Sequence, residues 1–459
     1  MVDLYEDREL VILRERVDEA ENKNKGHVHL TDSIKRMIVL VEDFIKENNL
    51  ICYGGTAINN ILPVDSQFYN RSIEIPDYDV FSKDPLTDAK KLADYFYSHN
   101  YTDVEAKSGL HKGTYKIFVN YVPVADITFL VPEIFDNILK SSIKINGILY
   151  APPNFLRMSM YLELSRPDGD VSRWEKILKR LILLNKHYPL IGKGCNSLNF
   201  IRSFETGTKY EIKRIYNIVK DTLTSLGVVF LGGYATTLYG KYMPRRKRKQ
   251  LKNNADFDVL SVEPETTSTI LKERLQDEGF NEINIKKHNA IGEIIPEHYQ
   301  VAVGRETVAI IYKTTACHSY NKIKIGENIV RIATIDTMLN FFLAFIYIDR
   351  PYYDHKRILC MAEYLFFVQA KNRLKQRGLL KRFSISCYGY QPTLADIRNE
   401  KMKKFKKLVD KKPKEYNELF FKYSPYKDTK KKKKKPSKKT KGRKSKTLKT
   451  KSNRTKEIK

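Results

Sequence analysis

The feature that most constrains the fold of this chain is a pattern that occurs twice. In the first copy, Gly54-Gly55 follows a short apolar run and precedes Asp77-Tyr78-Asp79. In the second copy, Gly232-Gly233 precedes Asp256-Phe257-Asp258 at nearly the same spacing, and similar helical and extended patterns surround both copies in the same order. The distance along the chain from Gly54 to Gly232 is too long for a solenoid repeat and predicts a duplicated domain.

Four segments are expected along the 459 residues. We expect an N-terminal helical extension at 1–29, a first unit at 30–190, a second unit at 191–425 and a tail at 426–459. The stretch 427–459 is rich in Lys, Ser and Thr, with 18 Lys or Arg against 2 Asp or Glu. A segment with almost nothing apolar cannot bury enough surface to offset its ordering entropy, so disorder is predicted there.

Hydrophobic periodicity predicts the elements of both units. Apolar residues at i, i+3, i+4 and i+7 predict helices, and alternating or short continuous apolar runs predict strands. The first unit is expected to hold helices at 34–45, 54–60, 87–97, 154–164 and 173–187 and strands at 50–53, 78–81, 115–120 and 122–130. The second is expected to hold helices at 212–226, 268–278, 335–347 and 353–374 and strands at 228–231, 257–261 and 299–312. The mixture predicts an α+β fold.

Asp77 and Asp79 are candidate metal ligands. Side chains at i and i+2 of a strand point to the same face, so both carboxylates can bind one pair of ions while Tyr78 points into the core. Mg²⁺ prefers carboxylate oxygens, and two ions need more ligands than two side chains supply, so a third carboxylate is expected on a neighbouring strand. Asp126 fits, because it lies in an otherwise apolar strand pattern where a bound metal would remove the cost of burying its charge. The alternative for Asp126 is a strand-end residue that faces water.

A Gly-Gly turn before a helix suits a phosphate group. Glycine lets the backbone approach the phosphates closely, Thr56 adds a hydroxyl, and the helix offers free N–H groups. Basic residues on two predicted helices are further candidate contacts to a triphosphate: Arg157, Arg173, Lys176, Lys179 and Arg180. Arg173, Lys176 and Arg180 are spaced i, i+3 and i+7 and therefore share one helix face. The alternative for these residues is a solvated basic surface.

The second copy lacks part of this set. Its strand at 307–312 is apolar where Asp126 would stand, and Tyr234 takes the place of Thr56. We therefore expect the second unit to serve as a scaffold or as an RNA-binding surface. Five basic residues between its glycines and aspartates are candidate RNA contacts, with a solvated loop as the alternative: Arg245, Arg246, Lys247, Arg248 and Lys249.

The overall charge favours a polyanionic partner such as a nucleic acid. The net charge is +29, of which the stretch 427–459 contributes +16, so the remainder keeps +13. The five cysteines are scattered without a CxxC pair, which argues against a zinc site and predicts reduced core thiols. No apolar run approaches the ~20 residues that span a bilayer, so an intracellular chain with no membrane partner is expected.

Several of these residues together resemble a known family. The segments that carry the resemblance are Tyr53-Gly54-Gly55-Thr56-Ala57-Ile58-Asn59, Leu62-Pro63, Phe68-Tyr69 and Pro76-Asp77-Tyr78-Asp79-Val80-Phe81-Ser82. They resemble the catalytic subunit of poly(A) polymerase from large nucleocytoplasmic DNA viruses, of the poxvirus, asfarvirus and giant-virus type. The resemblance covers residues 30–190 well and extends more loosely to about 425, through a degenerate second unit that the family also carries.

The resemblance implies two tandem polymerase-β-like nucleotidyltransferase units, the second of them degenerate. It implies template-independent addition of AMP from ATP to the 3′ end of viral mRNA, with two Mg²⁺ or Mn²⁺ ions as cofactors. Asp77 and Asp79 would bind both ions, Asp126 the ion at the RNA 3′ oxygen, and residues 54–56 the triphosphate. It also implies a homodimer or a complex with a processivity subunit, located in the host cytoplasm and the virion.

Two other functions remain open on the sequence alone. Nucleotide choice is not readable from these residues, so another template-free RNA nucleotidyltransferase, of a uridylating or CCA-adding type, is the second candidate. A non-catalytic RNA-binding or assembly protein derived from a transferase is the third, and the set of Asp77, Asp79 and Asp126 argues against it.

Overall fold

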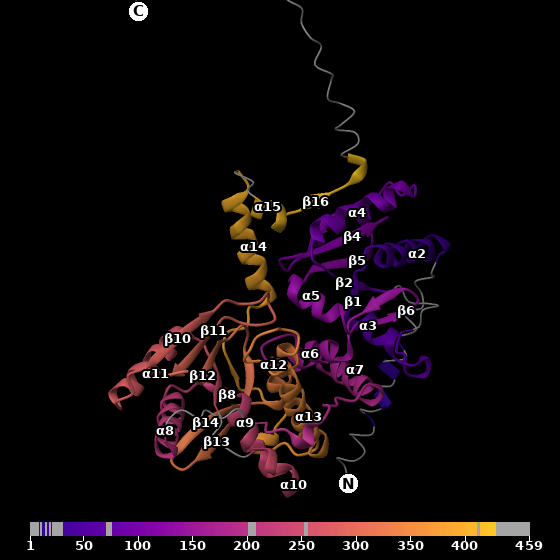
Figure 1. The fold of residues 1–459 in the computed structure, drawn as a ribbon. Coiled ribbons are helices and arrows are strands. Elements are labelled where there is room, and N and C mark those ends of the chain that lie inside the picture. The colour runs from indigo at the N-terminus through magenta and orange to yellow at the C-terminus, as the bar shows by residue number, and fades with distance from the viewer. Residues whose placement is uncertain are drawn as a thin grey trace, which may run out of the picture.

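The computed structural model describes residues 31–69, 76–200, 208–251, 256–410 and 414–427, together with six positions of an N-terminal helix: Glu9, Ile12, Leu13, Arg16, Val17 and Ala20. The predicted tail beyond Lys427 and most of the N-terminal extension lie outside these residues. Figure 1 shows two bodies of sheet and helix, the first in indigo and purple and the second in magenta and orange. Among the described helices, none is both long and apolar enough to cross a membrane.

The first unit alternates helices with short strands. Its elements are α2 (Asp32–Glu47), β1 (Ile51–Tyr53), α3 (Gly54–Ile61), β2 (Tyr78–Ser82), α4 (Pro85–Ser98), β3 (Val104–Ser108), β4 (Thr114–Val119), β5 (Val122–Phe129), α5 (Pro132–Leu139), β6 (Ile143–Ile145), β7 (Ile148–Tyr150), α6 (Pro153–Leu164) and α7 (Trp174–His187). Every helix and strand predicted for this unit is present within a few residues of its expected bounds. β3, α5, β6 and β7 are additions that the periodicity did not predict.

The second unit repeats the series. Its elements are α8 (Lys209–Ser225), β8 (Val229–Leu231), α9 (Gly232–Tyr239), α10 (Arg245–Arg248), β9 (Phe257–Ser261), α11 (Pro264–Asp277), β10 (Ile283–His288), β11 (His298–Val303), β12 (Glu306–Lys313), β13 (His318–Ile325), β14 (Asn328–Ala333), α12 (Ile335–Phe345) and α13 (His355–Lys371). The chain continues through β15 (Cys387–Tyr388), α14 (Leu394–Leu408), α15 (Lys414–Leu419) and β16 (Lys422–Tyr423).

Seven strands have the same order in the two sheets, which confirms the predicted duplication, and β16 and β15 are added at opposite edges. Within the described residues each sheet has eight strands, ordered β16-β3-β4-β5-β2-β1-β7-β6 and β10-β11-β12-β9-β8-β14-β13-β15. β1 is antiparallel to β2 and β2 is parallel to β5, just as β8 pairs with β9 and β9 with β12. An irregularity in register recurs as well, at Ile117/Phe118 in β4 and at Val301/Ala302 in β11.

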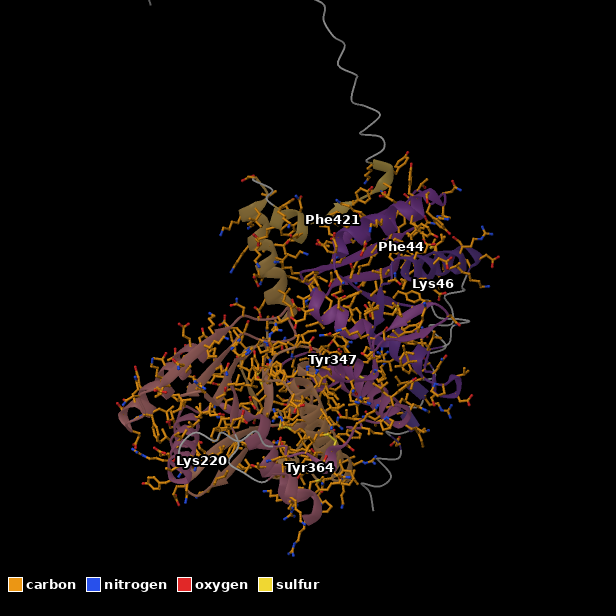
Figure 2. The ribbon with its side chains drawn as sticks, in the orientation of Figure 1. Phe44, Lys46, Lys220, Tyr347, Tyr364 and Phe421 are labelled. Atoms are coloured by element: carbon orange, nitrogen blue, oxygen red, sulfur yellow. A yellow bond between two sulfur atoms is a disulfide. The ribbon has the colours of Figure 1, made fainter. Side chains whose placement is uncertain are left out.

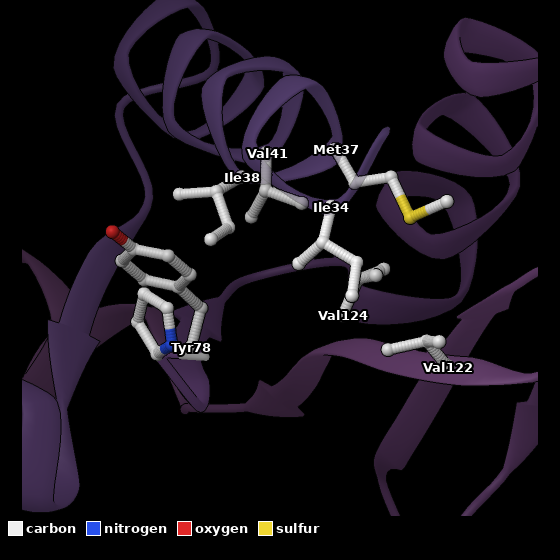
Figure 3. Close-up of a pocket in the computed structure, with 8 residues that line it drawn as sticks. Ile34, Met37, Ile38, Val41, Tyr78, Val122 and Val124 are labelled. Atoms are coloured by element: carbon white, nitrogen blue, oxygen red, sulfur yellow. The ribbon is translucent and has the colours of Figure 1, made fainter. Parts of the chain in front are cut away.

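Helices α2 and α4 pack on one face of the first sheet. On the other face Phe81 of β2 meets Phe155 of α6, while the side chains of β4 on that face are partly exposed. In β4, Tyr115, Ile117 and Val119 are buried while the residues between them are partly exposed. Figure 3 shows α2 lying over Tyr78 and Val124 on the covered face. By the alternation of strand side chains, the neighbours of Tyr78 in sequence point to the opposite, open face.

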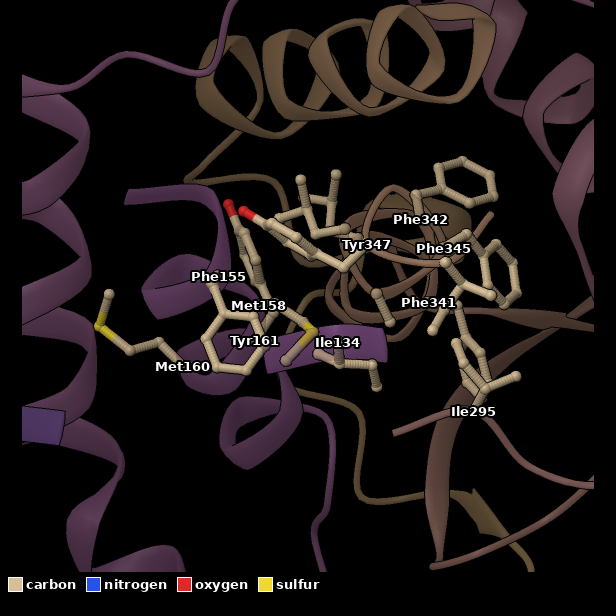
Figure 4. Close-up of a cluster of buried hydrophobic side chains, with 14 of the residues drawn as sticks. Ile134, Phe155, Met158, Met160, Tyr161, Ile295, Phe341, Phe342, Phe345 and Tyr347 are labelled. Carbon is tan, nitrogen blue, oxygen red and sulfur yellow. The ribbon is translucent and has the colours of Figure 1, made fainter. Parts of the chain in front are cut away.

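The two units pack through equivalent helices, since α6 follows β7 and α12 follows β14. Phe155 of α6 meets Tyr347 edge to face, with 5.4 Å between ring centroids. Figure 4 shows this buried cluster, in which Tyr161 and its neighbours on α6 face Phe341 on α12. At the rim, Arg350 pairs with Glu133 at 2.7 Å. The apolar surface buried here holds the two units in one arrangement.

The end of the described chain returns to the first unit. β16 pairs antiparallel with β3, and the Ser108 hydroxyl donates to the Leu419 carbonyl at 2.7 Å. Figure 2 shows Phe421 beside the first unit, where its ring meets Tyr115 edge to face. Residues 414–427, predicted to belong to the second unit and the tail, therefore return to the first unit and add β16 to its sheet.

The cysteine prediction is wrong for four of the five residues. Cys195 is bonded to Cys360 and Cys317 to Cys387, across 165 and 70 residues of sequence. Spacing along the chain cannot reveal such pairs, because only the packing of the second unit brings them together. Cys52 is a free, buried thiol as predicted, and burial raises its pKa above the ordinary value.

Replacing Phe155 by alanine should destabilise the protein strongly. Phe155 is 1% exposed and also meets Phe81 edge to face at 5.6 Å, so its removal opens a cavity at the contact between the units. We expect a loss of about 3–5 kcal/mol in the free energy of unfolding, measured by urea denaturation of the full chain. The control Val64→Ala, at an 81% exposed position, should change stability by no more than about 0.5 kcal/mol. Equal midpoints for Phe155→Ala and the wild type would contradict this account of the interface.

Candidate active site

Three carboxylates lie together on the open face of the first sheet. Asp79 in β2 is the direct register partner of Asp126 in β5, and Asp77 immediately precedes β2. Register partners on adjacent strands lie about 4.8 Å apart and point to the same face, and Asp77 shares that face by alternation. The structure thus brings together the three acidic residues that the sequence singled out, with the third on the neighbouring strand.

The carboxylates repel one another in a partly buried place. Burial first, and then the charges of Asp77 and Asp126, raise the pKa of the Asp79 carboxyl to about 7, although Lys116 and Arg173 lower it in part. The pKa of Asp77 is also raised, by burial and by Asp126, while Lys116 and Lys176 act in the opposite direction. Because the neighbouring positive charges do not fully neutralise these carboxylates, the site strongly favours bound cations.

Lys116 forms an ion pair with one of these carboxylates, and it was not among the residues predicted for the site. It lies on β4 as the register partner of Asp126, and its ammonium group forms an ion pair with the Asp126 carboxylate. A lysine in an alternating strand is an unremarkable pattern, so the pairing became visible only with the register of β4 against β5. The Asp126 side chain is 15% exposed, which makes this ion pair more than a surface contact.

The first glycine of each pair is required by the aspartate across from it. Gly54 follows β1 and opens α3 with φ +73°, and a Cβ built there would lie 2.6 Å from Oδ2 of Asp79. Gly232 repeats both properties, with φ +68° and the Asp258 carboxylate in the space a Cβ would take. The turn therefore lets the backbone N–H groups at the start of α3 lie against the carboxylates.

Gly55 lies against a cation and a phenol. A Cβ on Gly55 would come within 2.9 Å of an Arg180 guanidinium nitrogen and 2.7 Å of the Tyr69 hydroxyl. Arg180 donates to that hydroxyl at 2.5 Å, and its guanidinium lies 4.8 Å from the centre of the Phe68 ring. Arg180 is 7% exposed, so a positive charge is held rigidly beside the glycine turn.

The predicted basic face of α7 points toward the site. Arg173 and Lys176 both act electrostatically on the aspartates, and Arg180, on the same face, reaches the glycine turn. Arg173 also pairs with Glu163, with a nitrogen to oxygen distance of 3.4 Å. The hydroxyl of Thr56 donates to the Asp77 carbonyl at 2.7 Å and so anchors the start of β2.

Arg157 does not join this group. It is completely buried within the helices, where it donates to Asn185 at 2.7 Å, to Asn154 and to the Tyr188 carbonyl. These bonds tie α6 to α7, so the predicted ATP contact at Arg157 is not supported. The reason is that the Arg157 side chain points toward α7, which periodicity alone did not show.

The second unit has the same frame without the acidic set. Asp258 pairs with Ile310, which is 1% exposed and stands where Asp126 stands in the first unit, and Ile310 pairs with Gln300, at the position of Lys116. Aromatic side chains from α12 and the turn after it line the space beside Asp258, among them Phe345 and Tyr353, stacked at 4.4 Å. The prediction that the second unit lacks the third carboxylate agrees with this register.

The basic run of the second unit is a short helix. Arg248 donates to the carbonyls of Met243 and Lys241 at 2.8 and 2.9 Å, and the Lys247 ammonium lies 4.8 Å from the centre of the Phe367 ring. Arg245 and Lys249 are exposed, and the side chain of Arg246 lies outside what the structure describes. This run is in the second unit, so it is separate from the three carboxylates.

The residues of the first unit fit a site for divalent ions. Three carboxylates share one face of the sheet. Among the described residues, the ammonium group in register with them is that of Lys116, which forms an ion pair with Asp126. Hard carboxylate oxygens are the ligands that Mg²⁺ and Mn²⁺ prefer. Another cluster of potential ligands, Asp168 with Cys317 and Cys387, is a weaker candidate because both sulfurs are in a disulfide.

Comparison with known proteins finds a family model and curated relatives that are similar to part of the first unit. Residues 39–170 match the family model described as poly(A) polymerase catalytic subunit, a range that includes all three carboxylates and both glycines. A poly(A) polymerase catalytic subunit of Acanthamoeba polyphaga mimivirus is 32% identical over 196 residues, 40% of this chain and 33% of the relative. One of African swine fever virus is 32% identical over 163 residues, 34% of each chain. The matched region thus spans about a third of the length of these relatives, and the resemblance seen in the sequence is confirmed for that region.

A solved structure matches nearly the whole chain. The Megavirus polyadenylate synthase superposes with a TM-score of 0.76 and 19% identity, over 94% of this chain and 90% of its own. At that identity the match shows the fold. It confirms the predicted α+β architecture.

The pKa of Asp79 predicts that Asp79→Asn stabilises the metal-free protein at neutral pH. The folded-state pKa of about 7 lies above the ~3.9 of an unfolded Asp, so the folded state binds the proton more tightly. The wild type therefore loses stability as the pH rises from about 4 to about 7, whereas the Asn variant does not. In scanning calorimetry with EDTA, the melting temperature of the variant should exceed that of the wild type by a few degrees above about pH 7, and the gap should narrow toward about pH 4.

Asp65→Asn, at an exposed position of the same unit, provides the control and should show no such widening gap. If the Asp79→Asn gap is constant across the pH range, the raised pKa is refuted.

Gly54→Ala should damage the site more than a matched glycine replacement. Alanine at Gly54 incurs about 1–2 kcal/mol for the left-handed backbone and also collides with Asp79, whereas Gly279, with φ +88°, has nothing within 4 Å of its Cβ position. We expect Gly54→Ala to lower the free energy of unfolding more than Gly279→Ala and to weaken Mn²⁺ binding measured by titration calorimetry. Equal losses in the two variants would show that contact with Asp79 is unimportant.

Proposed function

We propose that this chain, whose residues 39–170 match poly(A) polymerase catalytic subunits, is a template-independent polynucleotide adenylyltransferase that adds AMP from ATP to the 3′ end of viral mRNA. The observation that carries the proposal is the direct pairing of Asp79 with Asp126, beside the Gly54 turn. The second unit repeats the fold with Ile310 in place of Asp126, so one unit carries the chemistry.

Asp77, Asp79 and Asp126 would hold two Mg²⁺ or Mn²⁺ ions. The ions, when bound, neutralise the triphosphate and lower the pKa of the attacking RNA 3′ hydroxyl. The role of the protein is to fix the carboxylates in one row, which the register of β2 against β5 accomplishes without a flexible loop.

The glycine turn and α7 are suited to bind the triphosphate. The free N–H groups at the start of α3 offer hydrogen bonds to phosphate oxygens, and no side-chain cap competes for them. Arg180 is fixed beside Gly55, and Arg173 and Lys176 add positive charge near the aspartates. In this arrangement the 3′ hydroxyl would lose its proton to solvent and its oxygen would bond to the α-phosphorus of ATP. The bond from the α-phosphorus to the bridging oxygen would break, pyrophosphate would leave, and these cations would stabilise its charge.

Template-free addition is consistent with a site whose proposed contacts are to the RNA backbone and to the triphosphate, because such contacts need no complementary nucleic-acid strand. The basic run at 245–249 is a further RNA contact in this proposal, supported by its exposed charge on the second unit. The partners are ATP and an RNA 3′ end, with a second copy or a processivity subunit. By similarity to viral enzymes, the protein would act in the host cytoplasm and be carried in the virion.

One assay separates this function from its alternatives. An RNA primer incubated with each of the four NTPs and Mg²⁺ should be extended with ATP in preference to the others. Preferential extension with UTP, or addition limited to CCA, would favour another template-free transferase. Absence of extension together with absence of ATP binding would favour a non-catalytic RNA-binding protein.

Asp77→Asn and Asp79→Asn should abolish AMP addition while RNA binding persists. Each removes a carboxylate ligand, and loss of metal stabilisation worth several kcal/mol lowers kcat by about a thousandfold or more. The matched variants Asp256→Asn and Asp258→Asn, at the equivalent positions of the second unit, should leave kcat within about twofold, since Ile310 removes the third ligand there. Primer extension and RNA binding by fluorescence anisotropy provide the two measurements. Wild-type activity in the Asp77 and Asp79 variants would end the proposal.

A further inference from the structure

A single row of side chains crosses the first sheet from the carboxylates to its edge. Asp126 is the register partner of Lys116, Lys116 of Lys107, and Lys107 of Lys422 on β16. Register partners point to the same face, so three ammonium groups, the lysine row, continue the line that begins at Asp79 and Asp126. With about 4.8 Å between strands, the row from Asp126 to Lys422 spans about 14 Å.

The lysine row lies on the open face of the sheet. The Lys116, Lys107 and Lys422 side chains are 41%, 42% and 68% exposed, while α2 and α4 pack on the opposite face. Glu105 lies between two of them, 3.4 Å from the Lys107 nitrogen and 2.6 Å from that of Lys422. In the part of the chain that the structure describes, these three cations stand in line and form ion pairs with two carboxylates, Glu105 and Asp126.

An aromatic ring belongs to the same face. Phe118 is two residues after Lys116 on β4, and the Lys107 ammonium lies 4.1 Å from the centre of its ring. Single-stranded RNA is commonly bound by two features together. Cations lie along its phosphate backbone, and an aromatic side chain stacks on a base.

The second unit has lost this arrangement together with the third carboxylate. At the positions of Asp126, Lys116 and Phe118 it carries Ile310, Gln300 and Ala302, and only Lys286 keeps the charge of Lys107. In the described part of the chain, no strand extends the sheet beyond β10, whereas β16 adds Lys422 to the first unit. The lysine row is thus specific to the unit with the carboxylates.

We propose that the lysine row and Phe118 bind the terminal nucleotides of the RNA, with the phosphate backbone along the lysines and a base on the ring. The proposal rests on the proposed function, since it places the 3′ end at Asp126. It adds an RNA site on the catalytic unit itself, distinct from the basic run at 245–249 on the second unit.

Lys116 has a second part in this proposal. Its ammonium group and a divalent ion compete for the Asp126 carboxylate, because both would contact the same group. With ions held by the carboxylates, Lys116 would leave Asp126 and would be free to pair with an RNA phosphate. Metal binding thereby prepares the end of the row that lies nearest the 3′ nucleotide.

The RNA site is tested by binding measurements without ATP. Affinity of a fluorescent oligoadenylate is measured by anisotropy in Mg²⁺ over a range of salt, for wild type, Lys107→Gln with Lys422→Gln, and Phe118→Ala. Each lysine lost from a single-strand site should reduce the slope of log affinity against log salt by about 0.7, so the double variant should lose about 1.4. Phe118→Ala should weaken binding by about fivefold or more, as expected for a lost base stack.

Matched variants make the result specific. Lys286→Gln, at the equivalent position of the second unit, should leave affinity and slope unchanged, and Lys107→Arg with Lys422→Arg should keep the wild-type slope because the charge remains. The inference is overturned if the Gln double variant keeps the wild-type slope, or if Lys286→Gln causes the same loss. Melting temperatures equal to that of the wild type exclude misfolding as the cause of weaker RNA binding. If the Gln double variant is unstable, the Arg double variant and Phe118→Ala still test the site.

The exchange of Lys116 is tested on the protein without RNA. In titrations with Mn²⁺ alone, Lys116→Gln should bind the ion several-fold more tightly than wild type, since the competing ammonium is gone, while Lys286→Gln should not differ. Unchanged or weaker Mn²⁺ binding in Lys116→Gln would refute the exchange. None of these measurements depends on nucleotide addition. If the enzyme is active but the variants of the lysine row and Phe118 bind RNA normally, only this inference is refuted. If the protein is inactive but these variants lose RNA affinity, only the proposed enzyme activity is refuted.

Discussion

The first unit is organised around negative charge that is concentrated on one face of its sheet, where β2 and β5 are partly buried. Asp79 and Asp126 are held opposite each other by the register of β2 and β5, so their repulsion cannot be relieved by moving apart. The raised pKa of Asp79 is the result, and Lys116, Arg173 and Lys176 are placed around the carboxylates to offset it. Such a site gives up stability in the free protein and gains affinity for divalent ions.

The duplication shows what happens to this frame when the constraint is removed. In the second unit Ile310 replaces the third carboxylate and Gln300 the lysine that pairs with it, so acid and counter-ion are absent together. Phe345 and Tyr353 line the space beside Asp258, and α12 provides the surface that packs on α6. The turn at Gly232 and Asp258 persists because the glycine and the aspartate fit each other sterically, with or without chemistry.

Much of the site was predictable from local patterns, and the failures have a common cause. Period-two alternation placed Asp77 and Asp79 on one face, and helical spacing placed Arg173, Lys176 and Arg180 on another, because both depend only on neighbours in sequence. Arg157 has a helical position as suitable as theirs, yet its side chain is buried against α7, where it donates to Asn185 and to the Tyr188 carbonyl. The disulfides, β16 and the pairing of Lys116 likewise join segments that are distant along the chain.

The sequence by itself determined that two related units exist, that one keeps a complete acidic set, and which side chains share a strand or helix face. These follow from short-range geometry, in which the backbone period fixes the direction of each side chain. Only the tertiary structure decided which strands are neighbours, and therefore that Asp79 faces Asp126, that Lys116 opposes them, and that the chain end carries Lys422 back to the same row. Strand register depends on the packing of the whole sheet, and no local pattern contains that information.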